Sequence, residues 1–364
     1  MAAGAVDALG SRGACSRSRG PGAARGARHQ PRPGARRRRA VRRAGDAAAP
    51  GARTAPSDAR ADHPAVRRQR LPPLTWTVAV AGTLHRDDIT TPHGRRTSLG
   101  GSAVYFALAA ARFAPVRLLG IAGPDTASDY RSLLEPFPID VSGLAGGSSH
   151  TFVWHAEHDF VRWVTARESA EPGCDPEWSP QLDAAARRAD VLFAASLDPR
   201  LQSSVLDQSS ARLIGCDSMT TFMHGDAATV LSVVERSDVV FLNRDELRTL
   251  TGVEPWLDAA RSLLGRGRVS AVVVKAGPDG AAVVGESLLI ESPASNEGDV
   301  VDPTGAGDAL AGAFLGTCAA LERRDSGVFE TALHNGVAAA SAAIRTFGLD
   351  GLLAFAGAPR SRAV

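Results

Sequence analysis

Asp302-Pro303-Thr304-Gly305-Ala306-Gly307-Asp308 combines small residues with two acids, and an apolar segment rich in Ala, Gly and Leu follows it at residues 309–316. Small residues at the start of a helix let successive backbone N–H groups point at one anion, and the helix dipole adds positive potential there. Such a turn stabilises the negative charge that develops on a phosphoryl group during transfer. The stretch therefore predicts a phosphoryl-transfer site.

Asp308 at the end of this turn needs its own explanation, because a carboxylate repels phosphate. It suits a general base that takes the proton of an attacking hydroxyl group. The alternative is a glycine-rich turn that only caps a helix, with Asp308 as a first-turn charge favoured by the helix dipole.

Charge is divided unevenly along the chain. Residues 1–70 contain 17 Arg, four Asp and no Glu, whereas residues 71–364 contain 24 basic and 35 acidic side chains. The first segment is rich in Arg, Ala, Gly and Pro and has few large apolar residues, so we expect it to be disordered. It is a basic tail, an organelle-targeting peptide, or a start-site artefact ahead of translation near Val66 or Leu71. We favour an inert tail or artefact and expect no nucleic-acid partner, because no motif in it carries a mechanism.

Apolar and cysteine patterns restrict the class of protein further. No uncharged run of about 18 apolar residues occurs, so the sequence predicts no membrane span. Four widely spaced cysteines form no CxxC pair, which argues against zinc and against a disulfide framework. We expect a cytoplasmic protein whose residues 71–358 form one α/β domain.

Short β-type runs alternate with helical stretches after residue 71, which predicts a mostly parallel sheet with helices on both faces. The predicted strands are Val78–Ala81, Val116–Leu119, Val191–Ala194, Leu213–Cys216, Val239–Leu242 and Ala271–Val274. The helix candidates include Ser102–Phe113, Pro199–Ser210, Ala227–Arg236 and Trp256–Arg266.

Two segments, near 85–99 and 150–166, break this alternation and predict a small β lid over one edge of the sheet. The first is polar, and in the second two apolar runs flank the turn Glu157-His158-Asp159, which indicates a hairpin. A lid that closes over a substrate excludes water from phosphoryl transfer, whereas the alternative is an ordinary surface hairpin.

Two further segments point to a ligand. Gly100-Gly101 directly precedes a helix, where glycine lets a ligand approach the backbone. The run from Cys216 to Phe222 follows a central strand, and it either lines the pocket or forms a loop with a buried thiol.

Four motifs in this order resemble the ribokinase-like, or PfkB, carbohydrate kinase family, from about Val78 to Leu353. The motifs are Gly100-Gly101 with the later segment Leu118–Asp125, then Asn243-Arg244-Asp245-Glu246, then Val274–Gly280, and finally Asp302–Asp308. The last is similar to the family's C-terminal signature. The resemblance implies a ribokinase-like fold, an ATP-dependent kinase, Mg²⁺ as a cofactor, and an alcohol group on a small molecule as the acceptor.

The resemblance also implies roles for individual residues. Asp308 matches the catalytic base, and Gly305, Ala306 and Gly307 match the anion hole. On the donor side it implies nucleotide contacts at Asn243, Glu246, Lys275, Gly277, Gly280 and Thr304. Glu246 matches the residue that organises Mg²⁺, through water, and Asp302 and Thr304 match backbone positions that hold a monovalent cation such as K⁺ in some members. Lys275 is the only lysine in the chain, and its role stays open between phosphate binding and structure.

On the acceptor side, the resemblance places Asp87, Gly100 and Gly101 against the substrate. Tyr105 stands where the family usually has Asn, and Ser102 stands where ribose-specific members have Lys. These departures leave the sugar open and admit a nucleoside as an alternative acceptor. A catalytically weak regulatory protein of the same fold is the other alternative. Similar kinases pair their lids between subunits, which is compatible with a homodimer.

Overall fold

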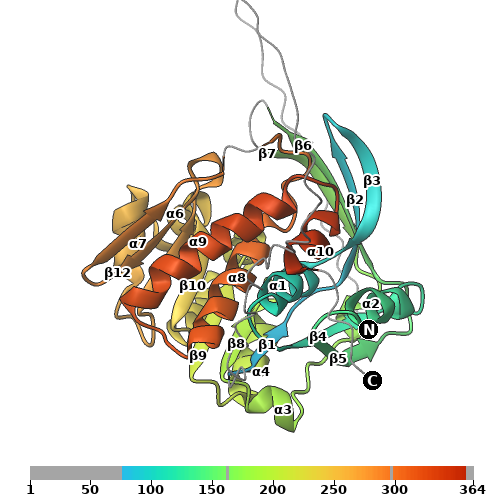
Figure 1. The fold of residues 1–364 in the computed structure, drawn as a ribbon, viewed down its shortest axis with the longest axis horizontal. Coiled ribbons are helices and arrows are strands. Elements are labelled where there is room, and N and C mark those ends of the chain that lie inside the picture. Colours follow the sequence, from blue (N-terminus) through green and yellow to red (C-terminus); the bar gives the residue numbers. More distant parts are fainter. Residues whose placement is uncertain (1–75, 161–163, 296–297, 358–364) are drawn as a thin grey trace, which may run out of the picture. The chain divides into compact units, whose positions relative to one another are not determined.

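The protein is described by a computed structural model that covers residues 76–160, 164–295 and 298–357 (Figure 1). The predicted disordered segment, residues 1–70, lies outside the described residues. No helix in the described part of the chain is long and apolar enough to cross a membrane.

A nine-stranded sheet forms the centre of the domain, in the order β13-β12-β11-β10-β9-β8-β1-β4-β5. The strands from β5 to β11 in this order are parallel to their neighbours, and β12 and β13 are antiparallel. This confirms the predicted mostly parallel sheet. The strand bounds are β1 Val78–Ala81, β4 Val116–Ala122, β5 Ile139–Gly146, β8 Val191–Ala194, β9 Leu213–Asp217, β10 Val239–Asn243, β11 Ala271–Lys275, β12 Ala281–Gly285 and β13 Leu288–Ser292.

Helices cover both faces of this sheet, because the strands are apolar on both sides. Val78 and Val80 of β1 belong to one buried cluster, with α1, α8 and α9, whereas Ala79 and Ala81 belong to the other, with α4, α5 and α7. Figure 1 shows α1, α8, α9 and α10 together in front of the sheet. The helix bounds are α1 Ser102–Ala111, α2 Ala127–Leu134, α3 Ala184–Arg187, α4 Pro199–Gln208, α5 Thr220–Glu235, α6 Arg244–Thr251, α7 Trp256–Leu263, α8 Ala306–Leu321, α9 Ser326–Ala343 and α10 Asp350–Ala356.

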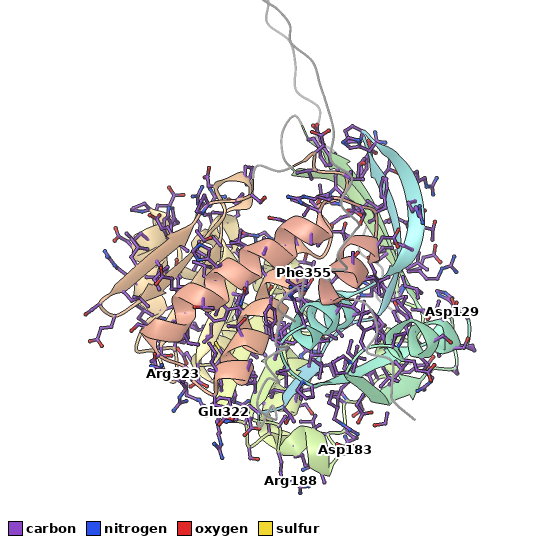
Figure 2. All side chains as sticks on the ribbon, viewed as in Figure 1. Asp129, Asp183, Arg188, Glu322, Arg323 and Phe355 are labelled. Atoms are coloured by element: carbon purple, nitrogen blue, oxygen red, sulfur yellow. The ribbon has the colours of Figure 1, made fainter. Side chains whose placement is uncertain are left out.

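The α8 helix packs directly against α1, as its small residues permit. A Cβ on Gly312 would lie 2.3 Å from the carbonyl oxygen of Phe106, so the two backbones touch where glycine stands. At the end of α1, Arg112 donates a 2.6 Å hydrogen bond to the carbonyl oxygen of Phe355 on α10. Figure 2 labels Phe355 among the side chains of the domain. These contacts hold α1 against α8 and α10.

One predicted helix start coincides with a kink inside α5. The sequence predicts a helix from Ala227, but α5 begins at Thr220 and has non-helical backbone angles at Asp226. The carboxylate of Asp226 accepts hydrogen bonds from the backbone N–H and the hydroxyl of Thr229, which restarts the helix. The predicted start is therefore a kink inside a longer helix.

A separate four-stranded sheet has the order β3-β2-β6-β7. Its strands are β2 His85–Thr91, β3 Gly94–Gly100, β6 Phe152–Asp159 and β7 Val164–Glu171. The strand β2 runs parallel to β6, and the other two pairs are antiparallel. We call this sheet the small sheet.

The predicted turn of the second hairpin is misplaced. His158 and Asp159 are still paired with β7, opposite Thr165 and Val164, so these predicted turn residues belong to the ladder. The ladder shifts register between Glu157 and His158. This irregularity explains why a polar break in the sequence resembles a turn there.

Candidate active site

A cavity of about 1070 Å³ lies at the carboxyl ends of the central parallel strands, between these ends, the start of α8 and the small sheet. Ligands bind at this edge of open α/β sheets because the connecting loops and helix starts converge there. Eight residues predicted for the site line the cavity. They are Asp87, Gly101, Glu246, Lys275, Thr304, Gly305, Gly307 and Asp308.

The anion turn, residues 302–308, leads into α8 through a left-handed glycine. Gly305 caps the helix with φ of 74°, which non-glycine residues rarely adopt. Asp302 is buried and accepts hydrogen bonds from the backbone N–H groups of Thr304 (2.9 Å) and Gly348 (3.4 Å). Its carboxylate therefore shapes the turn from beneath instead of facing the cavity.

Asp308 lies in the first turn of α8 and lines the cavity. Burial, together with the charge of Asp217, raises the pKa of Asp308 well above its usual range, and the ammonium of Lys275 opposes this shift. Because a raised pKa makes the ionised carboxylate a stronger base, Asp308 in its carboxylate form is suited to accept a proton from an alcohol.

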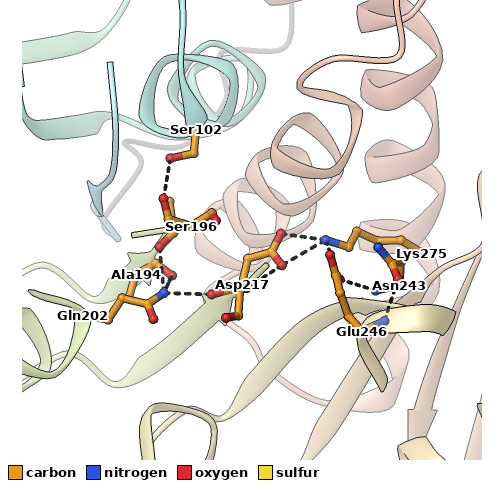
Figure 3. A network of polar contacts seen from close by, with 10 residues as sticks. Ser102, Ala194, Ser196, Gln202, Asp217, Asn243, Glu246 and Lys275 are labelled. Atoms are coloured by element: carbon orange, nitrogen blue, oxygen red, sulfur yellow. Dashed lines mark hydrogen bonds and ion pairs between the residues drawn. The ribbon is translucent and has the colours of Figure 1, made fainter. Parts of the chain in front are cut away.

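Three charged side chains meet on the donor side of the cavity (Figure 3). Lys275, at the end of β11, donates to both carboxylate oxygens of Asp217, at 2.9 and 2.8 Å. Its Nζ atom also lies 3.5 Å from Oε2 of Glu246. Burial raises the pKa of Glu246, and the charge of Lys275 limits the rise.

Asn243 and Glu246 form a capping box at the start of α6. The backbone N–H of Glu246 donates to Oδ1 of Asn243 (2.8 Å), and the backbone N–H of Asn243 donates to Oε2 of Glu246 (2.7 Å). This is the role that the same spacing has in many helices. Glu246 nevertheless lines the cavity, so the cap holds its carboxylate in place there.

Asp87 faces the cavity from β2 and is 1% exposed. Neither of its carboxylate oxygens has a hydrogen-bond partner. Burial, with the nearby charge of Asp302, raises the pKa of Asp87 to about 8, and burial lowers that of its neighbour His85 to about 3. A buried carboxyl group without a partner is costly. The arrangement therefore suits a polar ligand that supplies the missing donors.

The two glycines before α1 have structural partners. A Cβ on Gly100 would lie 1.8 Å from Oδ2 of Asp87, and a Cβ on Gly101 would lie 2.4 Å from the carbonyl oxygen of Thr83. Gly101 also has φ of 98° and lines the cavity. Gly100 thus leaves room for the Asp87 carboxylate, and Gly101 caps the helix beside the ligand space.

The remaining predicted residues do not line the cavity. They are Gly100, Asn243, Gly277, Gly280, Asp302 and Ala306. Gly280 adopts φ of 93° and packs against the backbone of β13, where a Cβ would lie 2.1 Å from the carbonyl oxygen of Ser292. Gly277 has φ of 56° and open space beside it. The turn therefore needs Gly280 for packing and leaves Gly277 accessible.

The predicted run from Cys216 to Phe222 lines the cavity through Asp217, Ser218, Met219, Thr221 and Phe222, and Cys216 is a buried thiol. Asp217, the last residue of β9, has no individual role predicted from the sequence. Tyr105 contributes a buried hydroxyl without a partner, and His158 of β6 contacts the Thr304 hydroxyl at 3.3 Å. Aromatic and sulfur-containing side chains complete the apolar part, namely Phe152, Trp154, Phe160, Trp178, Met219 and Phe222.

Comparisons with known proteins agree with this geometry. Residues 77–353 match the model of the pfkB family carbohydrate kinases. The chain therefore belongs to this family and is a kinase of the ribokinase-like fold.

Two relatives by sequence have names that state a nucleoside or a riboside as the acceptor. The cytidine kinase of Thermococcus kodakarensis is 30% identical over 249 residues, which cover 65% of this chain and 87% of that protein. The aminoimidazole riboside kinase of Salmonella typhimurium is 25% identical, over 65% of this chain and 78% of that protein. The crystal structure of the Salmonella enterica aminoimidazole riboside kinase, with its riboside and an ATP analogue, has a TM-score of 0.64 at 22% identity. It covers 76% of this chain and 96% of that one, and it shows a shared fold.

Proposed function

We propose that the protein transfers the γ-phosphoryl group of ATP to a primary hydroxyl group of a sugar or sugar-like molecule. The observation that carries this proposal is that one cavity contains the carboxyl groups of both Asp87 and Asp308. Asp87 has two oxygens without partners that can bind the acceptor's hydroxyl groups, and Asp308 is the last residue of the anion turn. One carboxyl group that binds the acceptor and one that acts as the base, beside a phosphate site, suit a kinase that phosphorylates an alcohol.

The transfer then follows from the positions of these groups. Asp87 accepts hydrogen bonds from the acceptor and orients the reacting hydroxyl toward Asp308, which removes its proton. The backbone N–H groups of Gly305 and Gly307 receive the negative charge of the transferring phosphoryl group, whereas the N–H of Ala306 already donates to the carbonyl oxygen of Pro303. A monovalent cation such as K⁺ at Asp302 and Thr304 is compatible with this mechanism, because each Asp302 oxygen accepts one backbone donor and keeps a further lone pair.

Mg²⁺ fits the donor side through Glu246. The cavity lining contains eight carboxyl groups among the described residues, so a triphosphate needs a counter-charge that the chain itself does not supply. Bound Mg²⁺ supplies that charge. Glu246 is held by its helix cap at the cavity wall and would keep the ion through a coordinated water, as suits a cation that retains part of its hydration shell.

The small sheet is the lid of this site in the proposal. His158 of β6 reaches the anion turn at Thr304, and Phe152 and Trp154 of the same strand line the cavity. Side chains of this sheet thus contribute a wall of the acceptor space. A lid in this place excludes water from the transfer.

A ribonucleoside is the second candidate acceptor, and a specific observation favours it. The cavity is larger than a monosaccharide needs, and Trp154, Trp178 and Phe222 give it aromatic walls on which a base can stack. The cytidine kinase and the aminoimidazole riboside kinase, whose names state such acceptors, are relatives by sequence.

An ADP-release screen tests the proposal. The full chain is incubated with MgATP and, in separate reactions, pentoses, hexoses, ribonucleosides and vitamin precursors. We expect acceptor-dependent ADP release with at least one of them. A protein that binds a sugar in calorimetry and releases no ADP with any acceptor would be the regulatory alternative.

A further inference from the structure

The cavity has few positive charges for a site that receives a triphosphate. Its described lining contains one permanently charged cation, Lys275, against eight carboxyl groups. Electrostatic attraction falls with distance, so the place of this ammonium decides where the cavity favours a phosphoryl group.

Lys275 lies directly beside the anion turn. A Cβ on Gly307 would lie 3.2 Å from Cδ and 3.4 Å from Nζ of Lys275. A side chain at residue 307 would therefore crowd the lysine. The ammonium thus lies next to the backbone amides that receive the transferring group and next to Asp308 in the same turn.

Asp217 is the residue that fixes the ammonium. Both of its carboxylate oxygens accept from Lys275, at 2.9 and 2.8 Å, whereas Glu246 lies at 3.5 Å and is already bonded to the backbone of Asn243. A bidentate contact restricts the ammonium more than a single long one does. Glu246 therefore remains available for the Mg²⁺ hydration shell.

Asp217 is itself held in place by its surroundings (Figure 3). It is 4% exposed, and the backbone N–H of Ser218 donates to its Oδ1 atom at 2.7 Å. The fully buried amide of Gln202 donates to the carbonyl oxygens of Asp217 (2.8 Å) and Ala195 (2.7 Å), which ties the ends of β8 and β9 together. The anchor of Lys275 is thus built into the sheet.

We propose that Asp217 is a positioning residue that holds Lys275 beside Gly307, and that Lys275 there is a catalytic residue contacting the transferring phosphoryl group. This inference rests on the proposed kinase function. In the transfer, the acceptor oxygen bonds to the γ-phosphorus, and the bond to the β,γ-bridging oxygen breaks. The bridging oxygen keeps the electron pair in ADP, and the acceptor's proton passes to Asp308.

Lys275 keeps its proton throughout this transfer. Burial alone would lower the pKa of Lys275, but the charges of Asp217 and Glu246 raise it above its usual range. A lysine that stays charged acts as a fixed electrostatic group and not as an acid. The competing explanation is an ion pair that only joins the ends of β9 and β11, which would affect stability and leave the chemical step alone.

A double-mutant cycle distinguishes the two explanations. The variants are Asp217→Asn, Lys275→Met and the double variant, with Asp207→Asn as a matched control, because Asp207 is exposed and pairs with Arg236. The readouts are kcat with the acceptor found in the screen, the Kd of MgADP by calorimetry, and the melting temperature. MgADP lacks the γ-phosphoryl group, so its binding separates the proposed contact from general damage to the site.

We expect each single variant to lose about 10²-fold in kcat, the size that follows removal of one stabilising contact to a developing charge. The double variant should lose no more than Lys275→Met does, because Asp217 acts through Lys275. The Kd of MgADP should change by less than about threefold, which is small beside the expected loss in kcat. Asp207→Asn should match the wild type.

If the fold-losses in kcat of the two single variants multiply in the double variant, the inference is overturned. A wild-type kcat in either single variant would overturn it too. If Asp217→Asn does not fold, Asp217→Glu serves instead. It keeps the charge but moves the ammonium, so kcat should fall about tenfold, and an unchanged kcat would refute the positioning role. A wild-type chain that releases no ADP with any acceptor would refute the proposed function, which is a different result.

Discussion

The ring of Tyr105 lies against the backbone of Gly305, where a Cβ would stand 2.1 Å from the Cδ1 atom of the ring. Tyr105 belongs to α1, and Gly305 caps α8. The contact joins α1 to the turn that we propose receives the phosphoryl group. Glycine is required at residue 305 for two independent reasons. The Tyr105 ring leaves no room for a side chain, and the backbone is in the left-handed region.

Gly305→Ala should therefore damage the site severely. The buried ring of Tyr105 leaves no room, so the turn must shift, and we expect kcat to fall by about 10²-fold. The free energy of unfolding should fall by roughly 1–3 kcal/mol, from overpacking and backbone strain. Gly225→Ala is the control, because it lies in α5 with open space beside it. Normal turnover in Gly305→Ala would contradict the role of the turn.

Tyr105→Phe tests the hydroxyl group of the same residue. Tyr105 lines the cavity and its hydroxyl has no hydrogen-bond partner in the protein, while the ring carries the contact with Gly305. Loss of a hydrogen bond to the acceptor should weaken its binding by roughly 0.5–1.5 kcal/mol, which is about two- to tenfold in KM. The melting temperature should not fall. An unchanged KM for every acceptor would show that the hydroxyl does not contact the substrate.

Asp87 makes stability depend on pH in a definite direction. Its pKa is raised to about 8 by burial, so the folded state binds a proton that the unfolded state releases above about pH 4. This contribution is complete at low pH and is lost as the pH rises through 8. The lowered pKa of His85 acts in the opposite direction below its unfolded value of about 6.5.

The effect of Asp87 is therefore clearest between pH 6.5 and 8, where we expect the free energy of unfolding to fall by roughly 1.5 kcal/mol from this group. Asp87→Asn should remove that part of the decline. Chemical denaturation of the ligand-free wild type and variant at a series of pH values measures the difference. Parallel curves for the two proteins would show that Asp87 ionises normally.

The variant Glu246→Gln tests the proposed magnesium role of Glu246 separately from its role in the helix cap. A glutamine oxygen can still accept from the backbone N–H of Asn243, so the capping box should survive with a stability loss below about 1 kcal/mol. The missing charge should raise the Mg²⁺ concentration needed for half-maximal activity at least tenfold. Asp245→Asn, an exposed neighbour paired with Arg248, is the control. An unchanged Mg²⁺ requirement in Glu246→Gln would remove Glu246 from the metal site.

The sequence predicts the parallel strands well because their apolar runs are buried on both faces. It misses β5, whose residues are mostly only partly buried, and β12 and β13, which form an antiparallel edge. In the site, Asp308 and Glu246 follow from local motifs. The Asp217–Lys275 pair does not, because its members are 58 residues apart and meet only when β9 and β11 flank β10. The contact of Gly100 with Asp87 likewise appears only when β2 pairs with β3.

The most direct test of the central claim is the turnover of Asp308→Asn with MgATP and the acceptor found by the ADP-release screen. Asparagine keeps the size of the side chain and removes the base. We expect kcat to fall by about 10²- to 10⁴-fold, the contribution of general base catalysis, while the melting temperature and the Kd of MgADP stay close to those of the wild type. A kcat within a few-fold of the wild type would contradict the assignment of Asp308 as the base.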